Sequence, residues 1–198
     1  MDYIFKSWND SWDFVYDIED NMFQLLLEMC GKYCSYASFK YSDSENKEAQ
    51  NFQVFKNFLV SSNYSFSNKL SSGLSFSNQI NKKTASPKQE IRYLYNVNTE
   101  FIEKMIELSP KLFSWIDGWG YHNPEDPYFY RADGSVFLAT SVHNCICCLF
   151  LPEGEFIYEN LLMKNGGVRN GFIPLTSSTY NYMKWIEVDP CKLIKENQ

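Results

Sequence analysis

The chain has 198 residues, of which 44% are hydrophobic, including 16 Phe, 14 Tyr and 5 Trp, and its net charge is −6. This length suits one domain and is enough to bury a sizeable core without disulfide bonds or metal ions. The sequence contains no run of 18 apolar residues, which excludes a transmembrane helix, and no basic patch, which argues against nucleic-acid binding.

The negative charge is concentrated in the first segment. Residues 1–28 contain seven acids and one base, a net charge of −6, whereas the remaining 17 acids and 17 bases cancel. Such a segment favours a basic protein partner, or else forms the solvated surface of an ordinary fold. The first residues lack the basic and apolar pattern of a secretory signal, so we expect a cytoplasmic protein.

Helical spacing predicts three helices. Apolar residues recur every three or four positions over residues 18–36, and Trp8, Trp12 and Tyr16 continue this spacing toward the N-terminus. A second helix is expected over 44–60, where four apolar side chains share one side. A third begins at Asn98 or Thr99, either of which can cap it, and runs along an apolar stripe to Leu108.

A Ser- and Asn-rich connection follows the second predicted helix, over residues 61–88. This composition is typical of a flexible linker. Alternating apolar residues instead predict two short strands, 63–67 and 73–77, as an edge hairpin. Both interpretations remain open for this segment.

The C-terminal half has the pattern of a sheet. Residues 128–131 predict a strand, Asp133-Gly134 a hairpin turn, and 135–151 a long strand or a bulged pair with two apolar faces, as in the centre of a sheet. Further strands are expected at 156–163, 172–175 and 182–188. We therefore predict an α+β fold, with N-terminal helices packed on a mainly antiparallel C-terminal sheet. The single domain 1–198 divides into a helical part over about 1–60, the connection, and a helix with the sheet over 90–190.

The cysteines are interpreted as reduced core thiols, because they lie in apolar surroundings. The six are Cys30, Cys34, Cys145, Cys147, Cys148 and Cys191. On one long strand, His143, Cys145 and Cys147 would share a face, but the second ligand pair of a typical zinc site is missing. Apolar surroundings also raise a thiol pKa, which disfavours a Cys–His nucleophile.

The loop at His122, Glu125 and Asp126 offers the other candidate chemistry. Adjacent carboxylates rarely point at one atom, so loop capping through backbone N–H groups is favoured over acid–base catalysis. We expect no catalytic activity, no cofactor and no metal. The alternative is a small hydrolase or metal-dependent enzyme that uses His122, Glu125, Asp126 and His143.

Residues 115–143 contain four short motifs in order. These are a Pro124-Glu125-Asp126 loop, a Phe129-Tyr130-Arg131 strand, the Asp133-Gly134 turn and a strand that ends in Ser141 and His143. The segment resembles bacterial immunity proteins of polymorphic or contact-dependent growth-inhibition toxin systems, although Asn144 stands where that pattern often has Glu. The resemblance implies a cytoplasmic inhibitor that covers the active site of a cognate protein toxin.

An acidic, aromatic surface near the N-terminus is the predicted binding site for that toxin. Its residues are Trp8, Asp10, Trp12, Asp13, Tyr16, Asp17, Glu19 and Asp20. The aromatic residues would anchor the partner, and the acids would steer a basic toxin such as a nuclease. The competing interpretations are that these aromatics belong to the core, and that the protein is a non-catalytic adaptor. No nucleic-acid or membrane partner is expected.

Overall fold

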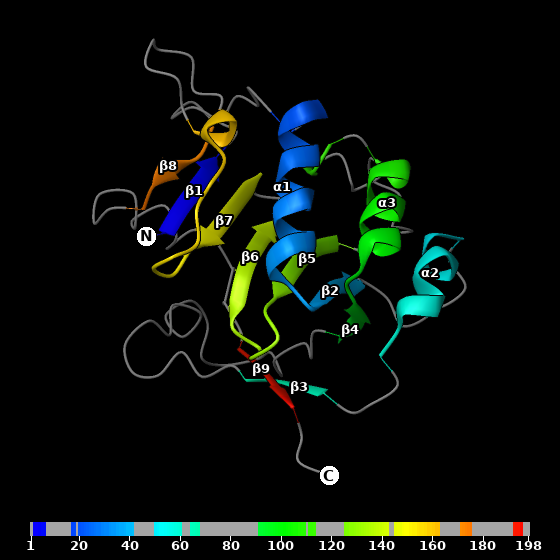
Figure 1. The fold of residues 1–198 in the computed structure, drawn as a ribbon. Coiled ribbons are helices and arrows are strands. Elements are labelled where there is room, and N and C mark those ends of the chain that lie inside the picture. Colours follow the sequence, from blue (N-terminus) through cyan, green and yellow to red (C-terminus); the bar gives the residue numbers. More distant parts are fainter. Residues whose placement is uncertain are drawn as a thin grey trace, which may run out of the picture.

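Two antiparallel sheets contain all the strands of the described residues (Figure 1). A computed structural model describes residues 2–6, 17–18, 20–41, 50–60, 64–67, 91–109, 111–113, 125–142, 145–162, 171–175 and 192–195. Seven strands form one sheet in the order β4-β2-β5-β6-β7-β1-β8, and β3 pairs with β9. The strands are β1 (Asp2–Lys6), β2 (Tyr36–Tyr41), β3 (Tyr64–Ser67), β4 (Ile91–Asn96), β5 (Glu125–Tyr130), β6 (Val136–Ser141), β7 (Ile146–Phe150), β8 (Ile173–Pro174) and β9 (Lys192–Lys195).

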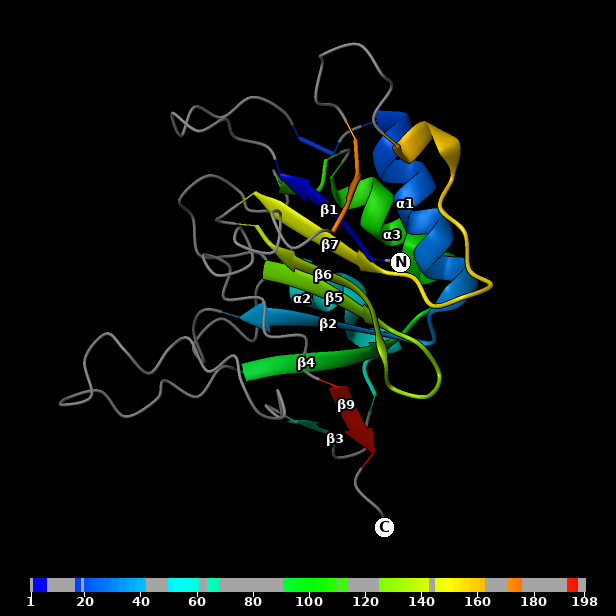
Figure 2. The ribbon, with the colours of Figure 1, turned by 90° about the vertical axis from the view of Figure 1, so that its left-hand side faces the viewer.

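The described helices cover one face of the large sheet (Figures 1 and 2). They are α1 (Asp20–Tyr33), α2 (Gln50–Phe55) and α3 (Thr99–Leu108), with the short 3-10 helices η2 (Lys56–Phe58) and η5 (Glu159–Leu161). The α1 helix lies beside α3, and α3 beside α2. None of the helices within the described ranges is long and apolar enough to span a membrane.

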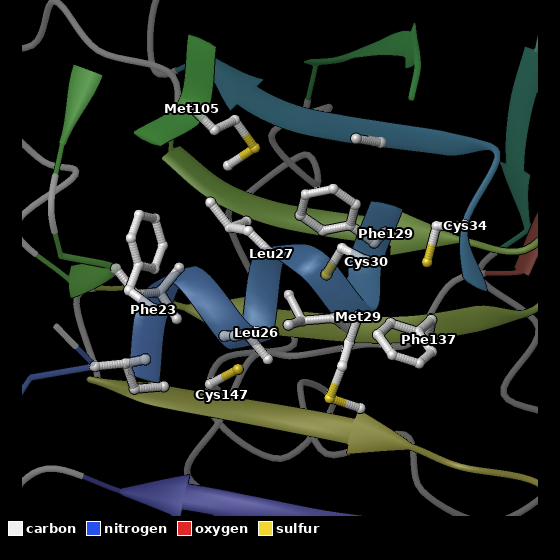
Figure 3. Packing of buried hydrophobic residues seen from close by; sticks show 14 of the residues in the cluster. Phe23, Leu26, Leu27, Met29, Cys30, Cys34, Met105, Phe129, Phe137 and Cys147 are labelled. Atoms are coloured by element: carbon white, nitrogen blue, oxygen red, sulfur yellow. The ribbon is translucent and has the colours of Figure 1, made fainter. Parts of the chain in front are cut away.

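The apolar stripe of α1 forms the centre of the core. Its buried side chains are Phe23, Leu26, Leu27, Met29 and Cys30. Figure 3 shows them together with Phe129 of β5, Phe137 of β6 and Cys147 of β7. Gly31 allows α1 to approach α3 closely, because a Cβ at this position would lie 3.3 Å from Cγ1 of Ile102.

Aromatic rings fill the space between α2, α3 and the strands β2 and β4. Phe55 lies 5.2 Å from Phe39 and 5.0 Å from Phe101 between ring centroids, and Tyr95 lies 5.4 Å from Phe39. All four residues are fully buried. Ring pairs at this spacing contribute about 0.5–1.5 kcal/mol beyond the burial of their area. Much of the high aromatic content therefore has a structural role.

The opposite face of the sheet is buried as well. Its buried side chains include Ile4, Tyr130, Ala139 and Cys148, from β1, β5, β6 and β7. The Ser38 and Tyr130 hydroxyl groups lie 3.0 Å apart in this buried setting. Burial on both faces agrees with the two apolar faces that the sequence indicated for residues 135–151.

The predicted fold class is confirmed, because helices combine with a large antiparallel sheet. The helix over 99–108 is confirmed, with the Asn98 side chain accepting the Phe101 N–H at 2.8 Å. The helix expected at 18–36 covers 20–33. Within the helix expected at 44–60, the structure describes α2 over residues 50–55 and η2 over residues 56–58.

The division into N-terminal helices and C-terminal strands is corrected by the structure. Residues 1–60 also contribute β1 and β2, and β1 lies inside the sheet between β7 and β8. The long strand at 135–151 is two antiparallel strands, β6 and β7, joined by a turn in which the Cys145 N–H donates to the Val142 carbonyl. Cys145 lies in that turn with a positive φ of 50°, so the prediction that it shares a strand face with Cys147 was wrong, and His143 lies outside the described residues.

One further strand prediction is corrected. Of the strand expected at 156–163, residues 156–158 have no regular structure and residues 159–161 form η5. The strand expected at 63–67 exists as β3, and it pairs with β9. Residues 172–175 contain the short strand β8, whereas 73–77 and 182–188 lie outside the described residues.

Candidate functional site

Asp17 and Asp20 are the members of the predicted acidic surface that the structure describes. The Asp17 Oδ1 accepts the Phe113 N–H at 2.9 Å, so this half-buried carboxylate links the start of α1 to the segment after α3. Asp20 is exposed and begins α1 with a φ of 50°. Trp8, Asp10, Trp12, Asp13, Tyr16 and Glu19 lie outside the described residues. Toxin binding through this surface stays a prediction.

Asp126 has the capping role that the sequence favoured. Its Oδ1 accepts the Val142 N–H at 2.7 Å, which ties the start of β5 to the end of β6. The side chain is buried and its backbone has a φ of 48°, a conformation that Asp tolerates better than most residues. Glu125 is the first residue of β5, and His122 and His143 lie outside the described residues. Of the four candidate enzymatic residues, Asp126 is the one whose side chain lies among those that the structure describes.

The described cysteines are free thiols in or beside the core. They are Cys30, Cys34, Cys145, Cys147 and Cys148, while Cys191 lies outside the described residues. Burial raises the pKa of Cys30 and Cys147 well above the ordinary value, and a hydrogen bond with Cys34 raises the pKa of Cys30 further. Burial also raises the pKa of Cys148 to about 12. These three thiols therefore stay protonated at neutral pH, which makes them poor nucleophiles.

Arg131 connects the β5–β6 turn to the segment after β7 through hydrogen bonds. Its Nε lies 2.8 Å from Oε1 of Glu155, and its Nη2 lies 2.6 Å from Oε2. The same guanidinium donates to the Val136 carbonyl at 2.7 Å and to the Phe150 carbonyl. It also lies over the Phe137 ring, 5.2 Å from the centroid. One side chain thus fixes the position of the residues that follow Glu155.

The next residue in the chain, Phe156, is the centre of an exposed aromatic surface. Its side chain is 53% exposed, the largest value among the exposed large hydrophobic residues that the structure describes. Its ring contacts Tyr33 edge-on at 6.4 Å and Tyr158 at 6.0 Å between centroids. The Lys32 Nζ lies 4.4 Å from the Phe156 centroid and 5.0 Å from that of Tyr33. We name Lys32, Tyr33, Phe156 and Tyr158 the Phe156 surface.

Sequence reasoning missed the Phe156 surface, because residues 156–163 were assigned to a strand. Pro152 and Gly154 mark a turn just before this segment, but a turn is equally compatible with a strand that follows it. Gly154 has a φ of 93°, which side-chain-bearing residues rarely adopt. The turn lets the chain leave β7 and run along α1, as Figure 1 shows.

Exposed charge in the described part of the chain is predominantly acidic. Among the residues whose side-chain exposure the structure describes, nine acids are exposed, against two lysines. The acids are Asp2, Asp20, Glu28, Glu100, Glu103, Glu107, Asp133, Glu153 and Glu159, and the lysines are Lys32 and Lys56. Half-buried charged residues are Asp17, Glu155, Lys104, Lys111 and Arg131. Six of these nine acids lie after residue 28, although acids and bases balance over residues 29–198 as a whole.

No family, curated protein or structural neighbour identifies this site. Comparisons with protein-family models, with curated proteins and with solved structures find no match. Within the described ranges, no group of three or more His, Cys, Asp or Glu side chains is placed to hold a metal ion.

Proposed function

We propose that this protein is an immunity protein that binds a basic protein toxin and neutralises it by covering the toxin's active site. The observation that carries the proposal is the excess of nine exposed acids over two exposed lysines, counted among the residues whose side-chain exposure the structure describes. A surface of one sign attracts a partner of the opposite sign and raises its association rate. A toxin that acts on nucleic acid has a basic substrate site, and acids mimic the phosphates that this site binds.

The roles of the candidate reactive groups also favour binding over catalysis. The carboxylate of Asp126 accepts a backbone hydrogen bond, and Cys30, Cys147 and Cys148 are buried in their protonated forms. A general base or nucleophile needs an accessible group whose pKa lies near the working pH. Binding a protein partner needs only a complementary surface.

The segment that resembles immunity proteins supplies part of the scaffold. Its described part forms the β5–β6 hairpin, in which Asp133 Oδ1 accepts the Ser135 N–H at 2.9 Å and Gly134 has a φ of 80°. Arg131 holds this turn against Glu155. The motif residues thus stabilise a hairpin, which is consistent with an inhibitor in which this scaffold positions the surface that the toxin contacts.

The test is a titration of the purified protein into the basic toxin encoded beside it. We expect an equimolar complex, complete loss of toxin activity and no turnover of either protein. Because exposed acids steer the encounter, salt should lower the association rate much more than it raises the dissociation rate. Toxin activity that persists at saturating inhibitor would contradict the proposal.

A further inference from the structure

The exposed ring of Phe156 has contacts that restrict its position before any partner binds. Scattered exposed apolar residues are common, so exposure alone indicates nothing. Here the ring contacts Tyr33 and Tyr158, and the preceding residue, Glu155, is fixed by two hydrogen bonds from Arg131. A side chain whose position is already restricted loses little conformational freedom on binding, which favours affinity.

Four exposed acids lie on the segments that carry this ring or its contact residues, or on the turn that Arg131 joins to Glu155. Glu153 and Glu159 lie three residues before and after Phe156, and Glu28 lies one helical turn before Lys32 on α1. Asp133 belongs to the turn that Arg131 joins to Glu155. The one exposed base here, Lys32, lies over the aromatic rings. An apolar centre with an acidic rim is complementary to an apolar site that is edged by Lys and Arg.

We propose that the Phe156 surface is the anchor by which this protein docks on its basic toxin. The inference rests on the proposed function and adds the contact surface to it. The Phe156 ring enters an apolar site of the toxin, and the acids Glu28, Asp133, Glu153 and Glu159 pair with basic side chains around that site. Aromatic residues at the centre of an interface commonly contribute most of its binding energy.

The first experiment measures toxin affinity for Phe156→Ala and for a matched control, Ile106→Ala. Ile106 lies on the exposed side of α3 and is 37% exposed, so both variants remove an exposed apolar side chain. We expect Phe156→Ala to weaken binding about 30-fold or more, as is typical of a hot-spot residue, and Ile106→Ala less than about threefold. Thermal unfolding of each variant checks that it is folded.

The second experiment compares two double charge reversals that change the net charge equally. Glu153→Lys with Glu159→Lys alters the rim of the Phe156 surface, whereas Glu100→Lys with Glu103→Lys alters exposed acids of α3. If the acids near Phe156 contact the toxin, the first pair slows association and speeds dissociation more than the second pair. Equal effects would show that only the overall charge matters, which would overturn the assignment of the surface.

The outcomes separate this inference from the proposed function. Tight toxin binding by the wild type and by Phe156→Ala alike would overturn the inference and leave the proposed function standing. No toxin binding by the wild type would overturn both. Sedimentation supplies a further test, since self-association that Phe156→Ala abolishes would assign the surface to a second copy of this chain and overturn the proposal.

Discussion

The Arg131 guanidinium binds both carboxylate oxygens of Glu155, at 2.8 and 2.6 Å, and so joins two loops that lie far apart in the sequence. The two side chains are only 14% and 16% exposed. The Nη1 and Nη2 atoms of Arg131 also donate hydrogen bonds to the carbonyls of Val136, at the start of β6, and Phe150, at the end of β7. The pair therefore connects the β5–β6 turn with the segment that carries Phe156.

Replacing Arg131 by Ala is expected to lower the free energy of unfolding by about 2 kcal/mol. The loss is smaller than for a fully buried pair because both side chains keep some contact with water. Arg131→Lys should also destabilise the protein, because an ammonium cannot reproduce the paired hydrogen bonds to Glu155. Urea unfolding measures both changes. The control is Lys104→Ala, which breaks an exposed pair with Glu107 at the same distance of 2.6 Å and should cause no measurable change.

Asp126→Ala and Asp126→Asn are expected to differ in stability. Alanine leaves the buried Val142 N–H without the acceptor that it has at 2.7 Å, which costs about 1–3 kcal/mol. Asparagine keeps an oxygen acceptor and tolerates the positive φ of this position, so its cost should be smaller. Urea unfolding distinguishes the two variants. An enzymatic activity lost in a stable Asp126→Asn protein would instead support the alternative enzyme.

Stability should fall at alkaline pH because of the buried thiols. Burial raises the pKa of Cys148 to about 12, whereas a thiol in the unfolded chain titrates at about 8.5. Above the lower value the unfolded chain releases a proton that the folded chain keeps, so the free energy of unfolding decreases as pH rises. The decrease is about 1 kcal/mol per pH unit for this thiol.

Denaturant unfolding between about pH 8 and 10 measures this slope. Cys148→Ala removes the titrating group, so its slope should be shallower than that of the wild type. Leu149→Ala is the matched control, because it truncates the neighbouring buried side chain of β7 without removing a thiol. It should lower stability at every pH and leave the slope unchanged. Identical slopes in Cys148→Ala and the wild type would contradict the assignment.

The contact between Gly31 and Ile102 predicts a coupling between α1 and α3. Alanine has a helix propensity about 1 kcal/mol more favourable than glycine, but its Cβ would lie only 3.3 Å from the Ile102 Cγ1. Gly31→Ala should therefore stabilise an Ile102→Ala background more than it stabilises the wild type. A double-mutant cycle from thermal or urea unfolding gives this coupling, and additive effects would show that the helices do not meet closely here.

Local signals explain which parts of the fold were predictable from the sequence. The α3 helix has both an apolar stripe and the Asn98 cap, so a window of about ten residues contains its whole signature. In β2, by contrast, the alternation of apolar and polar residues from Ala37 to Tyr41 is short, and Ser38 on its polar side is buried like Ala37 and Phe39. These residues form a strand because they pair with β4 and β5, which lie far away in the sequence.

The same distinction applies to the candidate site. The capping role of Asp126 followed from the chemistry of one loop and was confirmed by its bond to Val142. The exposure of Phe156 was not predictable, because alternating Phe156 and Tyr158 are equally typical of a half-buried strand. Only the turn at Gly154 and the tertiary contacts with Lys32 and Tyr33 place the ring at the surface.

The position of β1 has a consequence for biosynthesis. Asp2 pairs with Phe150 and Lys6 with Ile146 on one side of the strand, and Tyr3 pairs with Pro174 on the other. A ribosome makes these first residues long before it makes their partners, so β1 must wait in the nascent chain until β7 and β8 emerge. Pairings so distant in sequence close slowly, because a large loop must be ordered before the strands meet. During that interval β1 has neither of these two partner strands, and chaperones that shield nascent strands should be most needed then.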